Sequence, residues 1–378
     1  MQDRRVIVGI LVGLIGGVTY LAAGGRLPVS LKTLAGDTHG PLLSDSQGAL
    51  QEVVIQYVPS MAGMVETTYR QFLAALPPEV MVVAMCPDRA ACRDLCDRLG
   101  DSPCRVRPVI VDHAITTWSR DRWLALAPVR STGPATVISP RREDNKLAWP
   151  ERAGDERVGD DLAAALPVQA RAIRSRLEFD GGDFVTDQET VFVTPRMVTR
   201  NVPGRLSAAE LKAELEQLFE RPVVLLEKAP EHHAGMFMTL VGGRVALVGD
   251  PSLGRPLAPI GPSPAGDLDF STETQELFDA VATQVAAAGY RVVRMPILPG
   301  ADGRTFETPL NVIMDERAGE RVVYMPIYGH TPLLNRRATE IWQQLGFRVE
   351  TIDCSATFAH FGSLRCLVNV LRRDTRDG

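Results

Sequence analysis

The feature of this sequence that most limits its fold is a recurring order of predicted elements: a helix, a strand, a short polar segment and then two strands. Five copies of this order follow one another between residues 89 and 371, with irregular spacing. A unit that recurs along a chain indicates a repeat architecture, in which neighbouring units bury one another's apolar faces. We therefore expect an α/β fold built from five similar units.

Apolar periodicity and helix-capping residues define the elements of these units. The first unit has a helix over residues 89–99 and strands over 105–111, 123–128 and 136–139; the second has a helix over 160–176 and strands over 177–179, 184–186 and 190–193. The third has a helix over 208–219 and strands over 223–226, 236–241 and 244–248; the fourth has a helix over 274–288 and strands over 292–296, 310–314 and 322–325. The fifth has a helix over 334–345 and strands over 348–352 and 366–371.

The fifth unit lacks its final strand. A strand predicted over residues 53–58, near the start of the folded region, could supply it by closing the units into a ring. An ordinary doubly wound sheet is the alternative, because it also alternates strands with helices. That fold has fewer pairs of strands without an intervening helix.

Size and charge restrict the class of protein. The chain has 378 residues, of which 45% are hydrophobic, so it can bury one large core or two ordinary ones. The net charge is −5 and no basic run is present, so we expect no nucleic-acid partner. Four of the 41 basic residues are lysines and the other 37 are arginines, which we interpret as a bias of codon composition.

The N-terminus predicts a targeting or anchoring segment. Arg4 and Arg5 precede residues 6–24, which carry no charge. We expect residues 1–25 to be a signal peptide or an N-terminal membrane anchor, residues 26–50 to be a linker, and residues 51–373 to be the folded domain. The protein would then be membrane-anchored or secreted, with possible membrane association through residues 6–24. A buried helix is disfavoured because four glycines would weaken it.

Four of the six cysteines, Cys86, Cys92, Cys96 and Cys104, fall within nineteen residues. In an oxidising compartment they could form two local disulfides, with three possible pairings. Their spacings do not match a pair of zinc-binding cysteines, so a metal site is not expected.

Residues that could carry chemistry lie in the polar segments, just before the second strand of each unit. In chain order they are Asp121, Asp180 and Asp183, His233, Asn311 and Cys366. Equivalent positions in units around a pseudo-symmetry axis face that axis. One cysteine, one histidine and several carboxylates would then meet at the centre of the fold.

These segments resemble motifs of a known superfamily. Trp118-Ser119-Arg120-Asp121, Phe179-Asp180-Gly181-Gly182-Asp183, His232-His233-Ala234-Gly235-Met236-Phe237 and Gly362-Ser363-Leu364-Arg365-Cys366 come in the order found in the guanidino-group-modifying enzymes, or penteins, and are most like agmatine and arginine deiminases. The resemblance covers about residues 53–372. It implies a five-bladed α/β propeller with a central active site, a small guanidino or amidine substrate, and no cofactor or metal.

The resemblance also implies roles for single residues. Cys366 would be the nucleophile and His233 the general acid and base, with Asp180 as the partner of the histidine. Asp121 would bind the guanidinium through paired hydrogen bonds. Substrate contacts are also expected from Asp183, Arg120 and Asn311.

One departure from the family pattern bears on the substrate. The family motif His-x-Asp supplies a second guanidinium-binding carboxylate, and Gly235 stands at that position here. If His232 sets the register, the position is Ala234; Asp250 could compensate for the missing acid in either case. The sequence therefore predicts a cysteine-dependent hydrolase of a guanidino or amidino C–N bond with altered specificity. The alternatives are an amidinotransferase, or an inactive pentein that binds a ligand or partner.

Overall fold

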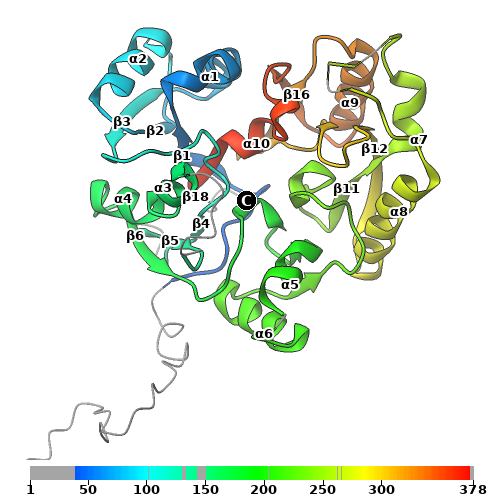
Figure 1. Cartoon of the computed structure of the whole chain (residues 1–378), viewed down its shortest axis with the longest axis horizontal. Helices are drawn as coiled ribbons and strands as arrows, with labels where there is room; N and C mark the ends of the chain where they lie inside the picture. Colours follow the sequence, from blue (N-terminus) through cyan, green and yellow to red (C-terminus); the bar gives the residue numbers. More distant parts are fainter. Residues whose placement is uncertain are drawn as a thin grey trace, which may run out of the picture. The chain divides into compact units, whose positions relative to one another are not determined.

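The structure, a computed structural model, describes residues 39–374 apart from residues 101, 130–132, 143–149, 203, 262 and 265. These residues belong to one body, Asp37–Gly378. In its described part, one sheet topology occurs five times: an antiparallel pair of strands, then a strand parallel to the second of the pair (Figure 1).

The strands are grouped here by sheet, each in hydrogen-bonded order. The first sheet contains β18 (Val368–Asp374), β1 (Ala49–Gln56), β2 (Met81–Cys86) and β3 (Arg105–Ile110). The second contains β4 (Leu124–Leu126), β5 (Ala135–Ser139) and β6 (Ala170–Arg174), and the third β7 (Phe184–Thr186), β8 (Val191–Val193) and β9 (Val223–Leu225). The fourth contains β10 (Met238–Leu240), β11 (Val245–Asp250) and β12 (Arg291–Pro296), and the fifth β15 (Ile313–Arg317), β16 (Glu320–Ile327) and β17 (Arg348–Asp353). A two-stranded ribbon pairs β13 (Leu298–Pro299) with β14 (Phe306–Glu307).

Helices lie between the strands, most of them between a strand pair and the parallel strand that follows it. They are α1 (Ala62–Ala75), α2 (Arg89–Leu99), α3 (Pro150–Asp155), α4 (Val158–Ala165), α5 (Pro195–Asn201), α6 (Ala208–Phe219), α7 (Pro251–Gly254), α8 (Thr272–Ala287), α9 (Pro332–Gln344) and α10 (Leu364–Leu367). Short 3-10 turns cover Pro59–Met61, Gly181–Asp183, Ala234–Met236, Arg255–Leu257 and Phe358–His360.

Side-chain caps explain where three of the longer helices, α2, α6 and α8, begin. The Asp88 side chain accepts from the amide of Ala91 at the start of α2, and Ser207 forms a reciprocal capping box with Glu210 at the start of α6. The Ser271 side chain accepts from the amide of Thr274 at the start of α8. These hydrogen bonds satisfy backbone amides that have no partner inside the helix.

The fifth unit receives its final strand from the beginning of the body, as predicted. The strand β1 pairs antiparallel with β18, with Val53 opposite Val370, and parallel with β2 on its other side. The five sheets are separate within the described residues, which excludes a single doubly wound sheet there. Helix α9 contacts both β17 and β12, so it packs one sheet against its neighbour.

Three predicted elements differ from the structure. The helix predicted over residues 160–176 ends at Ala165, and β6 follows it. Pro167 explains the break, because the residue before a proline is disfavoured in helical conformation. Residues 177–179 form no strand, and Cys366 lies on the short helix α10, because the last strand begins only at Val368.

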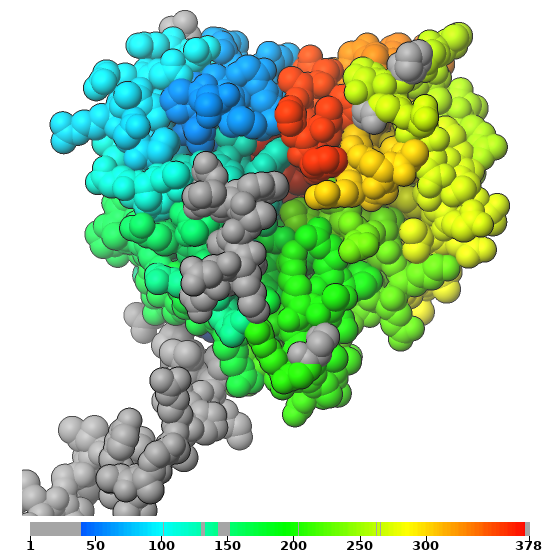
Figure 2. All heavy atoms as spheres, in the orientation of Figure 1, coloured from blue at the N-terminus to red at the C-terminus, as the bar shows by residue number. Residues whose placement is uncertain are grey.

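The sheets and helices are held together by several apolar clusters. Strand residues of β4, β5, β7, β8 and β10 are buried along their whole lengths, which is typical of strands covered on both faces. Trp123 and Trp342 are fully buried. Figure 2 shows the C-terminal segment, in red, reaching one face of the body between the blue and yellow segments.

The segment predicted to be a linker is in part folded. Leu42 and Leu50 are buried, and the amide of Gly40 donates to the carbonyl of Ala127 at 2.8 Å. The Asp45 carboxylate accepts from Arg365 at 2.9 Å through both oxygens. Residues 39–50 are therefore part of the body, because they bury apolar side chains and a charge against it.

The predicted signal peptide or anchor over residues 1–25, with its uncharged stretch 6–24, lies outside the described residues and stays a prediction, as does the rest of the linker. No helix between residues 39 and 374, where the structure describes them, combines the length and the apolar character needed to cross a membrane.

The disulfides that the four clustered cysteines could form are not present among the described residues. Cys86, Cys92, Cys96 and Cys104 are all free thiols. Cys86 and Cys104 are buried, whereas Cys96 is exposed on α2. Burial raises the pKa of the Cys86 thiol, so that thiol stays protonated in the fold.

We expect the substitution Asp45→Ala to lower the free energy of unfolding by about 3–5 kcal/mol, because it leaves the buried guanidinium of Arg365 without its counter-ion. Chemical denaturation measures this change. The matched control is Glu340→Ala, which removes an exposed ion pair with Arg337 and should change stability by less than about 1 kcal/mol. Equal effects of the two substitutions would show that the buried ion pair of Asp45 with Arg365 contributes no more to stability than an exposed pair.

Candidate active site

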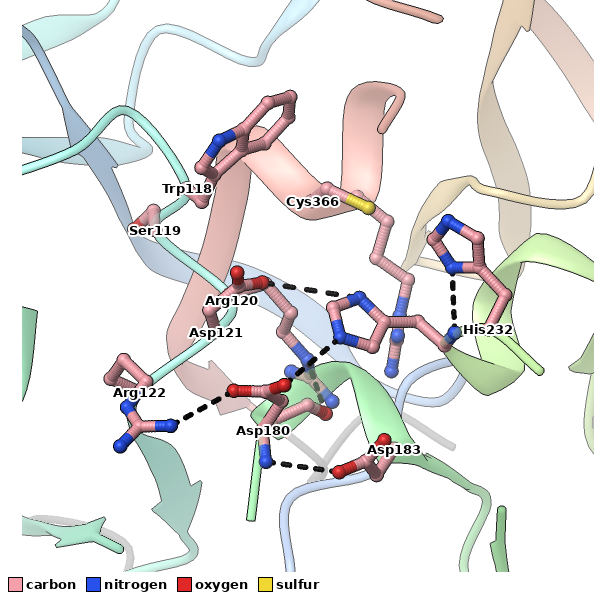
Figure 3. Close-up of polar contacts among 12 residues, drawn as sticks. Trp118, Ser119, Arg120, Asp121, Arg122, Asp180, Asp183, His232 and Cys366 are labelled. Atoms are coloured by element: carbon pink, nitrogen blue, oxygen red, sulfur yellow. Dashed lines mark hydrogen bonds and ion pairs between the residues drawn. The ribbon is translucent and has the colours of Figure 1, made fainter. Parts of the chain in front are cut away.

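Four polar segments bring their side chains into one cavity. Asp121 lies before β4, Asp180 before β7, His233 before β10, and Cys366 on α10 directly before β18. Each segment therefore occupies the same position relative to its sheet, at the entrance to the first strand of an antiparallel pair. Figure 3 shows Asp121, Asp180 and Cys366 around one space.

This cavity, the Cys366 cavity, has a volume of about 320 Å³. Its lining is mostly polar and charged, with two aromatic rings. The lining residues are Trp118, Asp121, Arg122, Arg152, Asp180, Arg196, Arg200, Glu231, His232, His233, Arg304, His360, Phe361 and Cys366. The cavity thus combines a thiol, an imidazole and two buried carboxylates.

The imidazole of His233 lies between two carboxylates. Its Nε2 is 3.5 Å from Oδ2 of Asp180, and its Nδ1 is 3.9 Å from Oδ1 of Asp121 (Figure 3). A Cβ atom on Gly182 would lie 2.4 Å from Cγ and Nδ1 of His233. The ring can occupy this place because position 182 has no side chain.

The two histidines of the doublet differ in charge. Burial alone would lower the pKa of His233, but hydrogen bonds with Asp180 and Cys366 and the charge of Asp121 raise it to about 10. Burial holds the pKa of His232 well below its usual range, with a further contribution from the charge of His233. His233 is therefore protonated at neutral pH, whereas His232 is neutral and accepts the backbone amide of His233 on Nδ1 at 2.7 Å.

Cys366 is held by its neighbours on two sides. Its amide donates to Oδ1 of Asn311 at 3.3 Å, and its Sγ lies 3.6 Å from the same oxygen. A Cβ on Gly362 would lie 2.4 Å from the ring of Trp118, so the small residue before the cysteine lets this indole approach. The thiol is 4% exposed, and its accessible face opens into the cavity.

Arginines that the sequence motifs did not indicate surround the two carboxylates. Arg152 bridges the pair: its Nη1 donates to Asp121 at 2.6 Å and its Nη2 to Asp180 at 2.7 Å. Asp180 also accepts hydrogen bonds from Arg122 at 3.1 Å and from Arg200 at 2.7 Å. Although burial would raise the pKa of Asp180, the charges of Arg152 and Arg200 and the hydrogen bond from His233 hold it well below its usual range.

Position 235 is occupied by glycine here and by an aspartate in the deiminases that the motifs resemble. The guanidinium of Arg365 fills the space next to it. A Cβ on Gly235 would lie 2.9 Å from Nη1 of Arg365 and 3.3 Å from Nδ2 of Asn311. Arg365 is fixed there by Asp45 and by the carbonyl of Phe184, which accepts at 2.9 Å. A carboxylate at position 235 would therefore require Arg365 to move.

The other predicted substrate contacts lie behind the cavity wall. Asp183 is fully buried and accepts from Arg200 at 2.6 Å and from Thr194 at 3.1 Å. Arg120 donates to the carbonyl of Gly181 at 3.2 Å and to Asn369 at 2.9 Å. Neither residue lines the cavity. Both hold the segments that carry the lining residues.

Asn311 and Asp250 have structural contacts of their own. Asn311 touches Cys366, as described above, and its Nδ2 finds no hydrogen-bond partner within the described residues. Asp250 caps α7 through the amides of Ser252 and Leu253 and does not line the cavity. It therefore does not replace the acid that is missing at position 235.

Comparison with known proteins gives matches in structure alone. No protein-family model matches the chain, and no curated protein matches its sequence. Agmatine deiminase of C. jejuni superposes with a TM-score of 0.67 at 11% identity, over 89% of this chain and 97% of that chain. Agmatine deiminase of Enterococcus faecalis gives 0.64 at 13% identity, over 93% of this chain and all of the other (100%).

A protein of Porphyromonas gingivalis described as a putative arginine deiminase gives a TM-score of 0.66 at 18% identity, over 89% of this chain and 98% of that chain. At these identities, the similarity concerns the backbone arrangement over nearly the whole of both chains. The chain therefore has an α/β fold similar to that of agmatine deiminases, as its motifs predicted.

Proposed function

We propose that the protein is a cysteine-dependent hydrolase that cleaves a C–N bond of a small guanidino or amidino compound. The observation that carries this proposal is the arrangement of Cys366, a protonated His233 and two carboxylates in one cavity. The fold shared with agmatine and arginine deiminases supports it. One similar structure is a cysteine-to-serine variant of agmatine deiminase with substrate bound.

The first half of the proposed reaction forms a covalent adduct. The Cys366 thiolate attacks the central carbon of the substrate, and a C–S bond forms as the C=N π pair moves to nitrogen. His233 then gives its proton to the departing nitrogen, and the C–N bond breaks to release ammonia or an amine. A thiolate is favoured beside the positive charge of an imidazolium.

The second half returns the enzyme to its starting state. His233 is now neutral, and it takes a proton from water as the oxygen attacks the amidino carbon. The C–S bond breaks, the thiolate of Cys366 is restored, and the product carries a carbonyl in place of the lost nitrogen. Asp180 and Asp121 stabilise the imidazolium and orient its two nitrogens.

We further propose that the five sheets are the blades of a five-bladed α/β propeller with the Cys366 cavity at its centre. The repeated sheet topology supports this arrangement, and so does the equivalent position of the four polar segments in their sheets. Asn311 precedes β15 and touches Cys366, so the fifth sheet also contributes to the site.

A non-catalytic ligand-binding protein is the second candidate. The observation that favours it is the pairing of both site carboxylates with Arg152, since a substrate guanidinium would need the same oxygens. An amidinotransferase would use the same first half-reaction, with an amine in place of water as acceptor. Supplying both acceptors in one assay distinguishes transfer from hydrolysis.

A substrate panel tests the proposal. We expect the full chain to release ammonia or an amine from at least one guanidino or amidino compound, and Cys366→Ala to lower this turnover by at least about a thousandfold. Cys96→Ala, which removes an exposed thiol on α2, should leave turnover unchanged. Full activity in Cys366→Ala would contradict the mechanism, and absence of turnover with every compound would favour the binding protein.

The raised pKa of His233 predicts a pH-dependent stability. A histidine titrates near 6.5 in the unfolded chain and at about 10 in the fold, so its proton stabilises the folded state. This contribution is complete below pH 6.5 and is lost as the pH rises to 10. We expect the difference in unfolding free energy between the wild type and His233→Gln to shrink over that range. A difference that stays constant or grows would contradict the assigned charge.

A further inference from the structure

The carboxylates of the Cys366 cavity are already engaged by the protein's own guanidinium groups. Arg152 spans Asp121 and Asp180 with two short hydrogen bonds, a geometry suited to the planar fork of a guanidinium. The charges of Asp121 and Asp180 raise the pKa of Arg152 despite its burial, so Arg152 keeps its charge. A substrate guanidinium would have to displace this side chain to reach either carboxylate.

More cationic than anionic side chains line the cavity. The lining carries five arginines (Arg122, Arg152, Arg196, Arg200, Arg304) against three carboxylates (Asp121, Asp180, Glu231). Behind the lining, Asp183 pairs with Arg200 and Glu156 with Arg122, and the charge of protonated His233 is offset by the Cys366 thiolate of the proposed reaction. A cation can attract a ligand of opposite charge where one of its sides, at the open end of the cavity, has no carboxylate of the described residues within salt-bridge distance.

Two of these arginines are placed to meet a ligand. Arg196 is 3.4 Å from Asp180 and 3.9 Å from Asp183, longer contacts than those of Arg200, and its side chain is 28% exposed. The guanidinium of Arg304 lies 4.5 Å from the ring centre of Phe361, at the exposed rim. Both arginines also line a neighbouring cavity of about 480 Å³, so they stand where the two spaces join.

We propose that the Cys366 cavity accepts a substrate that carries an oxyanion, bound by Arg196 and Arg304, and that Arg152, by occupying Asp121 and Asp180, excludes substrates that carry a positive charge and no oxyanion. The ligand class is a small organic carboxylate or phosphate, since both match the donor pattern of an arginine fork. The inference rests on the proposed function in one respect, because it names the charge of the substrate that Cys366 would attack.

Alkylating agents of different charge test this directly, because they report on the cavity without turnover. The full chain is treated separately with iodoacetate, neutral iodoacetamide and cationic 2-chloroacetamidine, and the alkylation rate of each cysteine is followed by peptide mass spectrometry. Exposed Cys96 in the same molecule gives the ratio of the alkylation rates of these reagents at a thiol outside the cavity. We expect the iodoacetate-to-iodoacetamide rate ratio at Cys366 to exceed that at Cys96 by about tenfold or more.

Variants of Arg152 test whether this residue causes the preference of Cys366 for anionic reagents. In Arg152→Ala, we expect the anion preference to fall at least about threefold and labelling by 2-chloroacetamidine to rise, since Asp121 loses its arginine partner and Asp180 loses one of its arginine partners. Arg152→Lys keeps the charge but not the bridging fork, and it should retain most of the anion preference. Arg337→Ala, on the exposed face of α9, is the control for loss of a positive charge and should change nothing. Circular dichroism checks that each variant is folded.

Competition identifies the oxyanion. At constant ionic strength, sodium acetate, succinate and inorganic phosphate should slow the reaction of Cys366 with iodoacetamide, and should slow it less in Arg196→Gln. Stronger protection by succinate would indicate a carboxylate ligand, and stronger protection by phosphate a phosphate ligand. Protection by guanidinium chloride instead of the anions would overturn the proposal.

The outcomes separate the two proposals. If Cys366 prefers anionic reagents but no guanidino or amidino compound is turned over, the proposed hydrolase function is contradicted and the proposed anion-binding site is supported. A preference of the wild-type Cys366 for 2-chloroacetamidine, relative to Cys96, would overturn the anion site and leave the hydrolase. Failure of Cys366 to react with all three reagents would count against both, because the thiol would then be inaccessible.

Discussion

The imidazole of His233 between the carboxylates of Asp121 and Asp180 is the interaction on which the rest of the site depends. Two carboxylates buried this close together repel one another unless cations compensate them. His233 supplies one positive charge and Arg152 another, shared between both acids. Arg122 and Arg200 also donate to Asp180, so the loss of His233 or Arg152 would weaken the compensation of Asp121 most.

The fold makes this cluster possible by bringing separate polar segments to one place. Each segment enters the first strand of an antiparallel pair, so its backbone direction is set by the sheet behind it. Close approach of the segments requires small residues at particular points. Gly182 admits the ring of His233 and Gly362 admits the indole of Trp118. The N-terminal residue Asp45 completes the support by holding Arg365 beneath position 235.

Much of the scaffold could be predicted from the sequence, because the periodicity of single elements depends on near neighbours. Helices α2 and α6 begin and end where predicted, and β1 takes its predicted place beside β18. The helix predicted over residues 160–176 was wrong because Pro167 outweighed its apolar pattern. Cys366, His233, Asp121 and Asp180 could be identified because they lie at equivalent points of a repeated unit.

The arginines of the cavity could not be predicted in the same way. Arg152, Arg196 and Arg200 come from α3 and α5, short helices outside the repeated pattern, and their partners are distant in sequence. The abundance of arginine over lysine, interpreted as codon composition, gave no indication of which residues face the site. Asp45 was missed because its segment resembles a linker in composition, and its contact with Arg365 spans most of the chain.

The central claim is that Cys366 forms a covalent bond to the substrate and that His233 protonates the departing nitrogen. Acid-quenched mass spectrometry of the enzyme during turnover measures this most directly. The account predicts an adduct on the peptide that contains Cys366, with the mass of the substrate minus the released ammonia or amine. Turnover with no adduct on that peptide, or with an adduct on a different cysteine, would contradict the account.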